Sequence, residues 1–132
     1  SEFKNRYKPF AFLDENTLRS AAFISTLIIS RAGAGAIFES AAWHKPSILI
    51  PLYNSAQDHQ RQNAYAYARA GGALVIEETN LAPHLLLAEI KKLFKDQNRL
   101  EKMKIAASNF SKINAAEILA REIVYLALEH TT

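Results

Sequence analysis

Residues 28 to 52, IISRAGAGAIFESAAWHKPSILIPL, constrain the fold more than any other part of this sequence. A short β-branched run is broken at Gly33 and Gly35, and residues 37 to 42 then carry apolar side chains at helical spacing. Pro46 ends that helix, because the residue before a proline is disfavoured in the helical region. The next residues are continuously apolar, as in a strand covered on both faces. The stretch therefore predicts a strand, a loop, a helix and a second strand.

The same alternation extends over much of the chain. We expect strands at 10–13, 27–30, 47–52 and 73–76, and helices between them at 17–25, 35–44 and 59–70. Crossovers of about a dozen residues are typical of a parallel sheet. After the last strand the pattern is helical only, with helices expected at 83–95, 97–108 and 114–129, the last folding over the sheet. Gly71 is expected to end the helix at 59–70, Pro83 and Asp96 to begin the next two helices, and a capping-box pattern at 114–117 to begin the last. The prediction is an α/β domain with a parallel sheet of about four strands, helices on both faces and a helical C-terminal tail.

Composition narrows the class of protein. A chain of 132 residues, about half of them hydrophobic, suits one domain with one core, and we expect residues 1–132 to form it, with 1–6 as a linker or cloning remnant. There is no cysteine for a disulfide or a thiolate metal site, and no apolar stretch approaches the roughly 20 residues of a membrane span. The net charge is only +3, and no aromatic residues alternate with the lysines, so nucleic-acid binding is not expected. Attraction to an anionic membrane surface stays open.

The loop from Ser30 to Gly35 is the first candidate for a binding site. Open parallel sheets bind ligands beyond the carboxyl ends of their strands, and small residues there let backbone N–H groups approach an anion at a helix start. Glu39 lies one turn into the helix, where it can accept hydrogen bonds from a diol such as a ribose. From spacing alone the alternative is a tight turn with a solvated Glu39, because AGAG is not a complete dinucleotide-binding fingerprint.

A second polar cluster follows the third expected strand. His59, Gln60 and Asn63 lie within about one helical turn, and amides and a neutral imidazole offer donors and acceptors together, as sugar hydroxyls require. This loop leaves the sheet on the same side as the glycine-containing loop. Each residue could instead be a surface group or a helix cap, and Asp58 is expected to cap this helix.

These motifs resemble a known family. SRAGAGAIFESAAWHKPSILIPL, then QDHQRQNA and ARAGGALVIEE, are similar to the donor-binding domain of the MurG family of bacterial N-acetylglucosaminyltransferases, from about Tyr7 to the C-terminus. The resemblance implies one half, Rossmann-like, of a two-domain GT-B enzyme that binds UDP-N-acetylglucosamine. It assigns Glu39 to the ribose hydroxyls and Gln60 and Asn63 to the donor sugar, with His59 beside them. It assigns the diphosphate to a loop made of Ala32, Gly33, Ala34 and Gly35.

The resemblance also implies the reaction of the parent enzyme. A hydroxyl of a lipid-linked muramoyl-pentapeptide attacks the anomeric carbon of the donor with inversion, in peptidoglycan synthesis at the inner face of the bacterial cell membrane. No metal or other cofactor is expected. No catalytic residue is assigned in this chain, because the general base is expected in an N-terminal acceptor domain that the sequence does not contain.

The family pattern further implies that two strands and a GGS-type phosphate loop are missing. These strands would lie between those expected at 10–13 and 27–30, so their absence would open the sheet. We therefore expect strand 10–13 to move beside strand 27–30, or the free edges to pair with a second copy of the chain. Three functional alternatives stay open: an isolated non-catalytic folding unit, the donor-binding subunit of a split transferase, and a fragment of a sugar-nucleotide 2-epimerase.

Overall fold

The structure, a computed structural model, describes residues 3–52 and 58–130. Its centre is a parallel sheet in the order β1-β2-β3, formed by β1 (Ile28–Ser30), β2 (Ser47–Leu49) and β3 (Ala73–Val75). Ile29 pairs with Ile48, and Ile48 pairs with Leu74. The strand, helix and strand expected within residues 28 to 52 are all present, and so is the strand expected at 73–76.

Helices cover both faces of this sheet, as predicted. On one face α2 (Ala34–Ala42) and α3 (Asp58–Arg69) bury a cluster that includes Leu49 of β2. On the other face α4 (Pro83–Lys95) contributes Leu93 to a cluster with Ile48 of β2. Neighbouring residues of one strand thus serve opposite cores, because side chains alternate along a strand. Gly71, expected to end α3, has a φ of 100°, which an L-residue with a side chain rarely adopts.

The strand expected at 10–13 is wrong. Residues 7–10 and 12–14 have no regular secondary structure, and Phe10 and Phe12 are 62% and 85% exposed. A strand needs a partner for its backbone hydrogen bonds, and β1 pairs only with β2 among the described residues. The expected move of 10–13 beside 27–30 is therefore also wrong.

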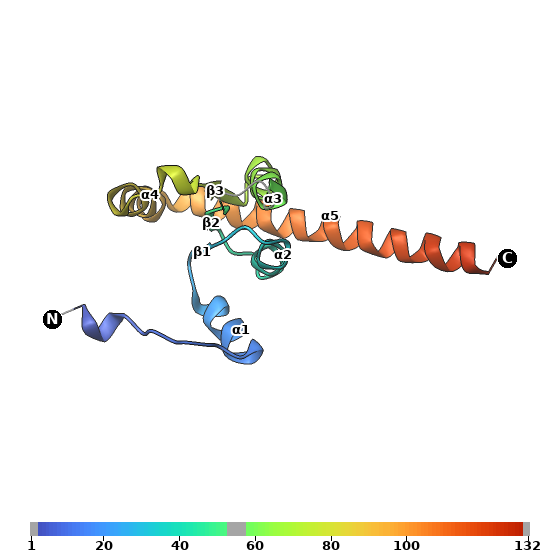
Figure 1. Cartoon of the computed structure of the whole chain (residues 1–132), viewed down its shortest axis with the longest axis horizontal. Helices are drawn as coiled ribbons and strands as arrows, with labels where there is room; N and C mark the ends of the chain where they lie inside the picture. The colour runs from blue at the N-terminus through green and yellow to red at the C-terminus, as the bar shows by residue number, and fades with distance from the viewer. Residues whose placement is uncertain (1–2, 53–57, 131–132) are drawn as a thin grey trace.

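The N-terminal part of the chain makes few contacts with the sheet. It contains η1 (Lys4–Arg6) and α1 (Glu15–Ile24), and Figure 1 shows both apart from the layers around the sheet. Asp14 caps α1 by accepting a hydrogen bond of 2.7 Å from the Thr17 N–H. Lys45 Nζ holds the end of α1 by donating to the carbonyl oxygens of Phe23 and Ser25, each at 2.9 Å.

The last two expected helices are one continuous helix, α5 (Gln97–Glu129). Its N-cap is Asp96, as predicted, which accepts a 3.0 Å hydrogen bond from the Arg99 N–H. No glycine or proline interrupts residues 97–129, so the capping-box pattern at 114–117 does not start a new helix.

The path of α5 also differs from the prediction. Its early residues pack with α4, through Leu100 and Met103, and its middle packs with α2 and α3, through Ala107 and Phe110. The end of the helix then projects beyond the other elements instead of folding over the sheet (Figure 1). The apolar side chains described there are more than half exposed, namely Leu119, Ile123, Val124, Tyr125, Leu126 and Leu128.

Candidate functional site

The start of α2 has the backbone geometry of an anion site. Gly33 is the N-cap, with φ −63° and ψ 148°, and its carbonyl accepts the first helical hydrogen bond from the Ile37 N–H at 3.1 Å. The N–H groups of the first helical turn have no acceptor within the helix, and they form its positive end. Because this turn follows β1, these N–H groups lie at the carboxyl edge of the sheet, where the sequence predicted a phosphate loop.

The two glycines of this loop face open space. A Cβ atom added to Gly33 or Gly35 would meet no described atom within 4 Å, so packing does not require a glycine at either position. Ala32 differs, since it is completely buried in the cluster with Ile37 and Ala41. Of the four predicted loop residues, Ala32 therefore exposes no surface to a ligand.

Glu39 lies on the same helix as these N–H groups and is exposed. The buried residues of α2 are Ile37, Ser40 and Ala41, and at 100° per residue Glu39 lies nearly opposite their mean direction. Its carboxylate makes no hydrogen bond or ion pair with the described part of the chain. The structure thus leaves this carboxylate accessible to a ligand bound at the start of α2.

The three predicted residues of α3 divide into two kinds. His59 and Asn63 are exposed, whereas Gln60 is half-buried and its Oε1 accepts a 3.4 Å hydrogen bond from the Leu52 N–H. Gln60 therefore ties α3 to the chain that follows β2. The side chain of Asp58, which was predicted to cap this helix, lies outside the part of the chain that the structure describes.

One small cavity is lined by a residue of the predicted phosphate loop and a residue of the predicted sugar-binding cluster. It has a volume of about 150 Å³, and both Ala34 of the predicted phosphate loop and Asn63 of the predicted sugar cluster line it. Ala34 and Asn63 therefore lie close together on the adjacent helices α2 and α3.

A hydrogen-bonded network after β3 was not predicted from the sequence. The Tyr65 hydroxyl donates to Glu77 Oε1 at 2.7 Å, and Arg61 Nε donates to the same oxygen at 2.8 Å. The bonds from Tyr65 and Arg61 hold the pKa of the Glu77 carboxyl below its usual value, and the bond to Glu77 raises the pKa of Tyr65. Glu77 follows a strand at the carboxyl edge of the sheet, and this position was the signal that could have identified it.

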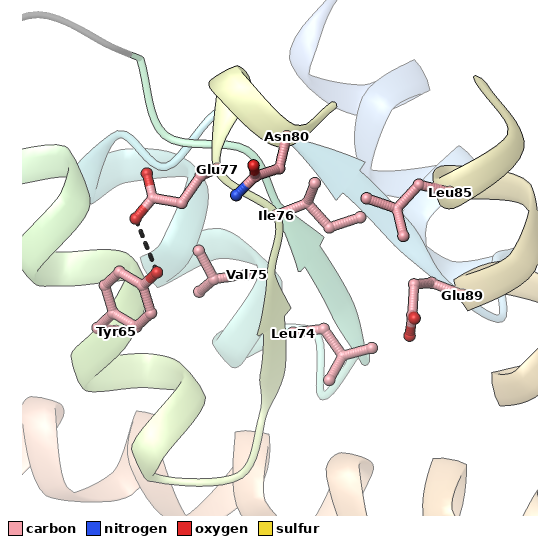
Figure 2. A pocket seen from close by; sticks show the side chains of 8 residues that line it. All are labelled: Tyr65, Leu74, Val75, Ile76, Glu77, Asn80, Leu85 and Glu89. Carbon is pink, nitrogen blue, oxygen red and sulfur yellow. Dashed lines mark hydrogen bonds between the residues drawn. The ribbon is translucent and has the colours of Figure 1, made fainter. Parts of the chain in front are cut away.

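The same network borders a second cavity, of about 350 Å³. Figure 2 shows Tyr65 and its bond to Glu77 on one side of β3, with Leu85 and Glu89 of α4 on the other. Nearby, Arg31 of the loop after β1 pairs with Glu78 at 2.8 Å. This contact links the phosphate-loop region to the chain that follows β3.

The described residues contain neither a metal-ligand cluster nor a membrane-spanning helix. No group of three or more His, Asp or Glu side chains is placed to hold a metal ion. Among the helices of residues 3–52 and 58–130, none is both long and apolar enough to cross a bilayer.

Fold and site together define an α/β domain in which a helix starts at the carboxyl edge of a parallel sheet, a geometry that suits an anion. Comparison with known families is more specific, because residues 1–119 match the model of the glycosyltransferase family 28 C-terminal domain. The chain belongs to this family.

Individual relatives agree with this assignment. Over 96 residues the chain is 47% identical to the UDP-N-acetylglucosamine--N-acetylmuramyl-(pentapeptide) pyrophosphoryl-undecaprenol N-acetylglucosamine transferase of Caulobacter vibrioides, covering 73% of this chain and 27% of that protein. The transferase of the same name from Chlorobium luteolum is 40% identical over 111 residues, covering 84% and 30%. The chain spans less than a third of the length of these relatives.

A solved structure is also similar. The crystal structure of Acinetobacter baumannii MurG matches with a TM-score of 0.68 and 26% sequence identity, over 77% of this chain and 28% of that one. The α/β fold is therefore that of a GT-B glycosyltransferase half, as the sequence predicted.

Proposed function

We propose that this chain is the UDP-N-acetylglucosamine-binding part of an inverting glycosyltransferase of peptidoglycan synthesis. The observation that carries the proposal is the start of α2, where free backbone N–H groups, open space at Gly33 and Gly35, and an exposed Glu39 occur together in a family 28 domain. The reaction is the one for which the relatives are named, transfer of N-acetylglucosamine to an N-acetylmuramyl-pentapeptide on pyrophosphoryl-undecaprenol.

In this proposal each part of the donor has its own contacts. The diphosphate lies against the N–H groups that follow Gly33, where the positive end of α2 favours an anion. Glu39 accepts hydrogen bonds from the ribose hydroxyls, and a carboxylate suits this role because it has only acceptor sites. Asn63 and His59 face the sugar, and Gln60 between them is held by its hydrogen bond from the Leu52 N–H.

The same geometry favours the transfer reaction. When the acceptor hydroxyl attacks the anomeric carbon, the bond to the diphosphate breaks and negative charge builds on the departing UDP. The N–H groups of α2 are already oriented toward that charge, so little reorganisation is needed as it develops. No residue of this chain is proposed as the general base, which we place in an N-terminal acceptor domain, so that this chain alone binds the donor without transferring the sugar. Because the proposed acceptor is lipid-linked, we propose that the reaction takes place at a membrane surface, the cytoplasmic one.

Titration calorimetry with UDP-N-acetylglucosamine tests the proposal on Glu39→Gln. This change keeps the size of the side chain and removes its charge, and loss of charge-assisted hydrogen bonds weakens binding by about tenfold or more. Glu101→Gln, an equivalent change at an exposed position of α5, is the matched control and leaves affinity unchanged. Equal affinity of the Glu39→Gln variant and the unaltered chain would remove Glu39 from the site.

A further inference from the structure

The small cavity between α2, α3 and α5 has features that packing alone does not explain. Three of its lining residues come from α2, two from α3 and two from α5, namely Ala34, Ile37, Phe38, Asn63, Ala66, Phe110 and Asn114. The lining thus combines alanine methyl groups, two aromatic rings and two primary amides. A few polar groups in an apolar hollow are typical of ligand sites.

The two amides have no partners in the described protein. No hydrogen bond of the Asn63 or Asn114 side chain occurs among residues 3–52 and 58–130. Asn114 is half-buried and lies in the interior of α5, where asparagine is a poorer helix former than alanine. The sequence pattern suggested a helix cap at this position, but α5 continues through it. Asn114 therefore neither caps a helix nor completes a hydrogen bond.

The position of the cavity relates it to the proposed donor site. Ala34 is the first residue of α2, so its methyl group borders the cavity while its N–H belongs to the proposed diphosphate site. A sugar attached to the second phosphate begins within one or two bonds of that site. The cavity is also small: at about 150 Å³ it is below the roughly 300–1,000 Å³ of pockets that enclose a whole ligand, so it suits one substituent.

We infer that this cavity receives the acetamido group of an amino-sugar donor, with Asn114 as an additional contact residue. The inference rests on the proposed function and specifies which part of the donor is recognised here. An acetamido group has one N–H donor, one carbonyl acceptor and one methyl group. The amides of Asn63 and Asn114 offer a C=O for the N–H and an NH₂ for the carbonyl, and the methyl groups of Ala34 and Ala66 provide an apolar surface.

The test compares UDP-N-acetylglucosamine, UDP-glucose and UDP as ligands of the chain, followed by amide NMR and calorimetry. With UDP-N-acetylglucosamine, the side-chain NH₂ signals of Asn114 shift, and Asn114→Ala weakens binding by about three- to tenfold, the value of one lost hydrogen bond. Affinity for UDP-glucose and UDP is unchanged by this substitution. Asn109→Ala, at an exposed position of the same helix, is the matched control and changes none of the three affinities.

The outcomes separate this inference from the proposed function. Alanine favours helix more than asparagine does, so the Asn114→Ala variant melts at the same or a higher temperature, and weaker binding is not a folding defect. If UDP shifts the amides at the start of α2 but Asn114→Ala binds UDP-N-acetylglucosamine normally, the acetamido subsite is refuted and the donor site stands. If none of the three ligands shifts these amides, both proposals fail.

Discussion

The buried hydroxyl of Tyr67 leads to a specific prediction about the stability of the fold. Tyr67 is completely buried, its ring lies 4.9 Å from that of Phe110, and its oxygen has no hydrogen-bond partner in the described structure. A buried hydroxyl without a partner costs about 1–3 kcal/mol, whereas the small void left by its removal costs about 0.5 kcal/mol or less. We therefore expect Tyr67→Phe to raise the free energy of unfolding by about 1 kcal/mol at pH 7.

The difference in free energy of unfolding between Tyr67→Phe and the native protein should increase at alkaline pH. Burial raises the pKa of Tyr67 to about 12, from the 10.0 of an ordinary tyrosine. Ionisation of this group therefore leaves the free energy of unfolding unchanged below pH 10 and lowers it as the pH rises from 10 toward 12, because only the unfolded chain ionises easily in that window. By linkage the native protein loses about 1.4 kcal/mol from this group at pH 11, and the Tyr67→Phe variant loses none of it.

Urea unfolding followed by far-ultraviolet circular dichroism measures both effects, at pH 7 and pH 11. Tyr125→Phe, on the exposed end of α5, is the control and should differ from the native protein by less than about 0.5 kcal/mol at either pH. The comparison between variants cancels the other groups that titrate in alkali. If Tyr67→Phe is destabilising at pH 7, with the same difference at pH 11, the hydroxyl has a partner and the burial argument is wrong.

Two further predictions concern packing and assembly. A Cβ atom on Gly72 would lie 2.3 Å from Cε2 of Tyr67, so Gly72→Ala should lower the free energy of unfolding by about 1–3 kcal/mol, measured by urea unfolding; unchanged stability would show that the ring can move aside. Pairing of the open β1 edge with a second copy would make the chain dimeric by sedimentation equilibrium, and Ile29→Lys would make it monomeric because a lysine blocks edge pairing. Phe12→Lys, in the exposed N-terminal segment, is the control, and a native monomer at all concentrations would contradict the pairing.

The elements that were predicted correctly are those whose signals are local. Gly71 and Pro83 fix the end of α3 and the start of α4 through backbone constraints that do not depend on the rest of the fold. The strand at 73–76 and the loop at Gly33 follow from apolar runs and small residues in the same way. The positions of the candidate site residues relative to the sheet could therefore be inferred from the sequence alone.

The wrong predictions depend on partners that are distant in sequence or missing. Residues 10–13 have the composition of a strand but no neighbouring strand with which to pair, and pairing decides whether a strand forms. The capping-box pattern at 114–117 lies within a long run of good helix formers, so α5 continues. Likewise, the contact between Tyr65 and Glu77 spans twelve positions along the chain and depends on how α3 packs against β3.

The unbroken helix α5 has a mechanical consequence. Its 33 residues span about 50 Å, and about its first half is fixed by contacts with α4, α2 and α3. Since a helix without proline or glycine bends only gently, the exposed end of α5 keeps a nearly fixed direction relative to the sheet. A partner bound to residues 119–128 is consequently held at a fixed distance and angle from the loop at Gly33, and a force applied to this end of α5 is transmitted to α2, which that loop begins.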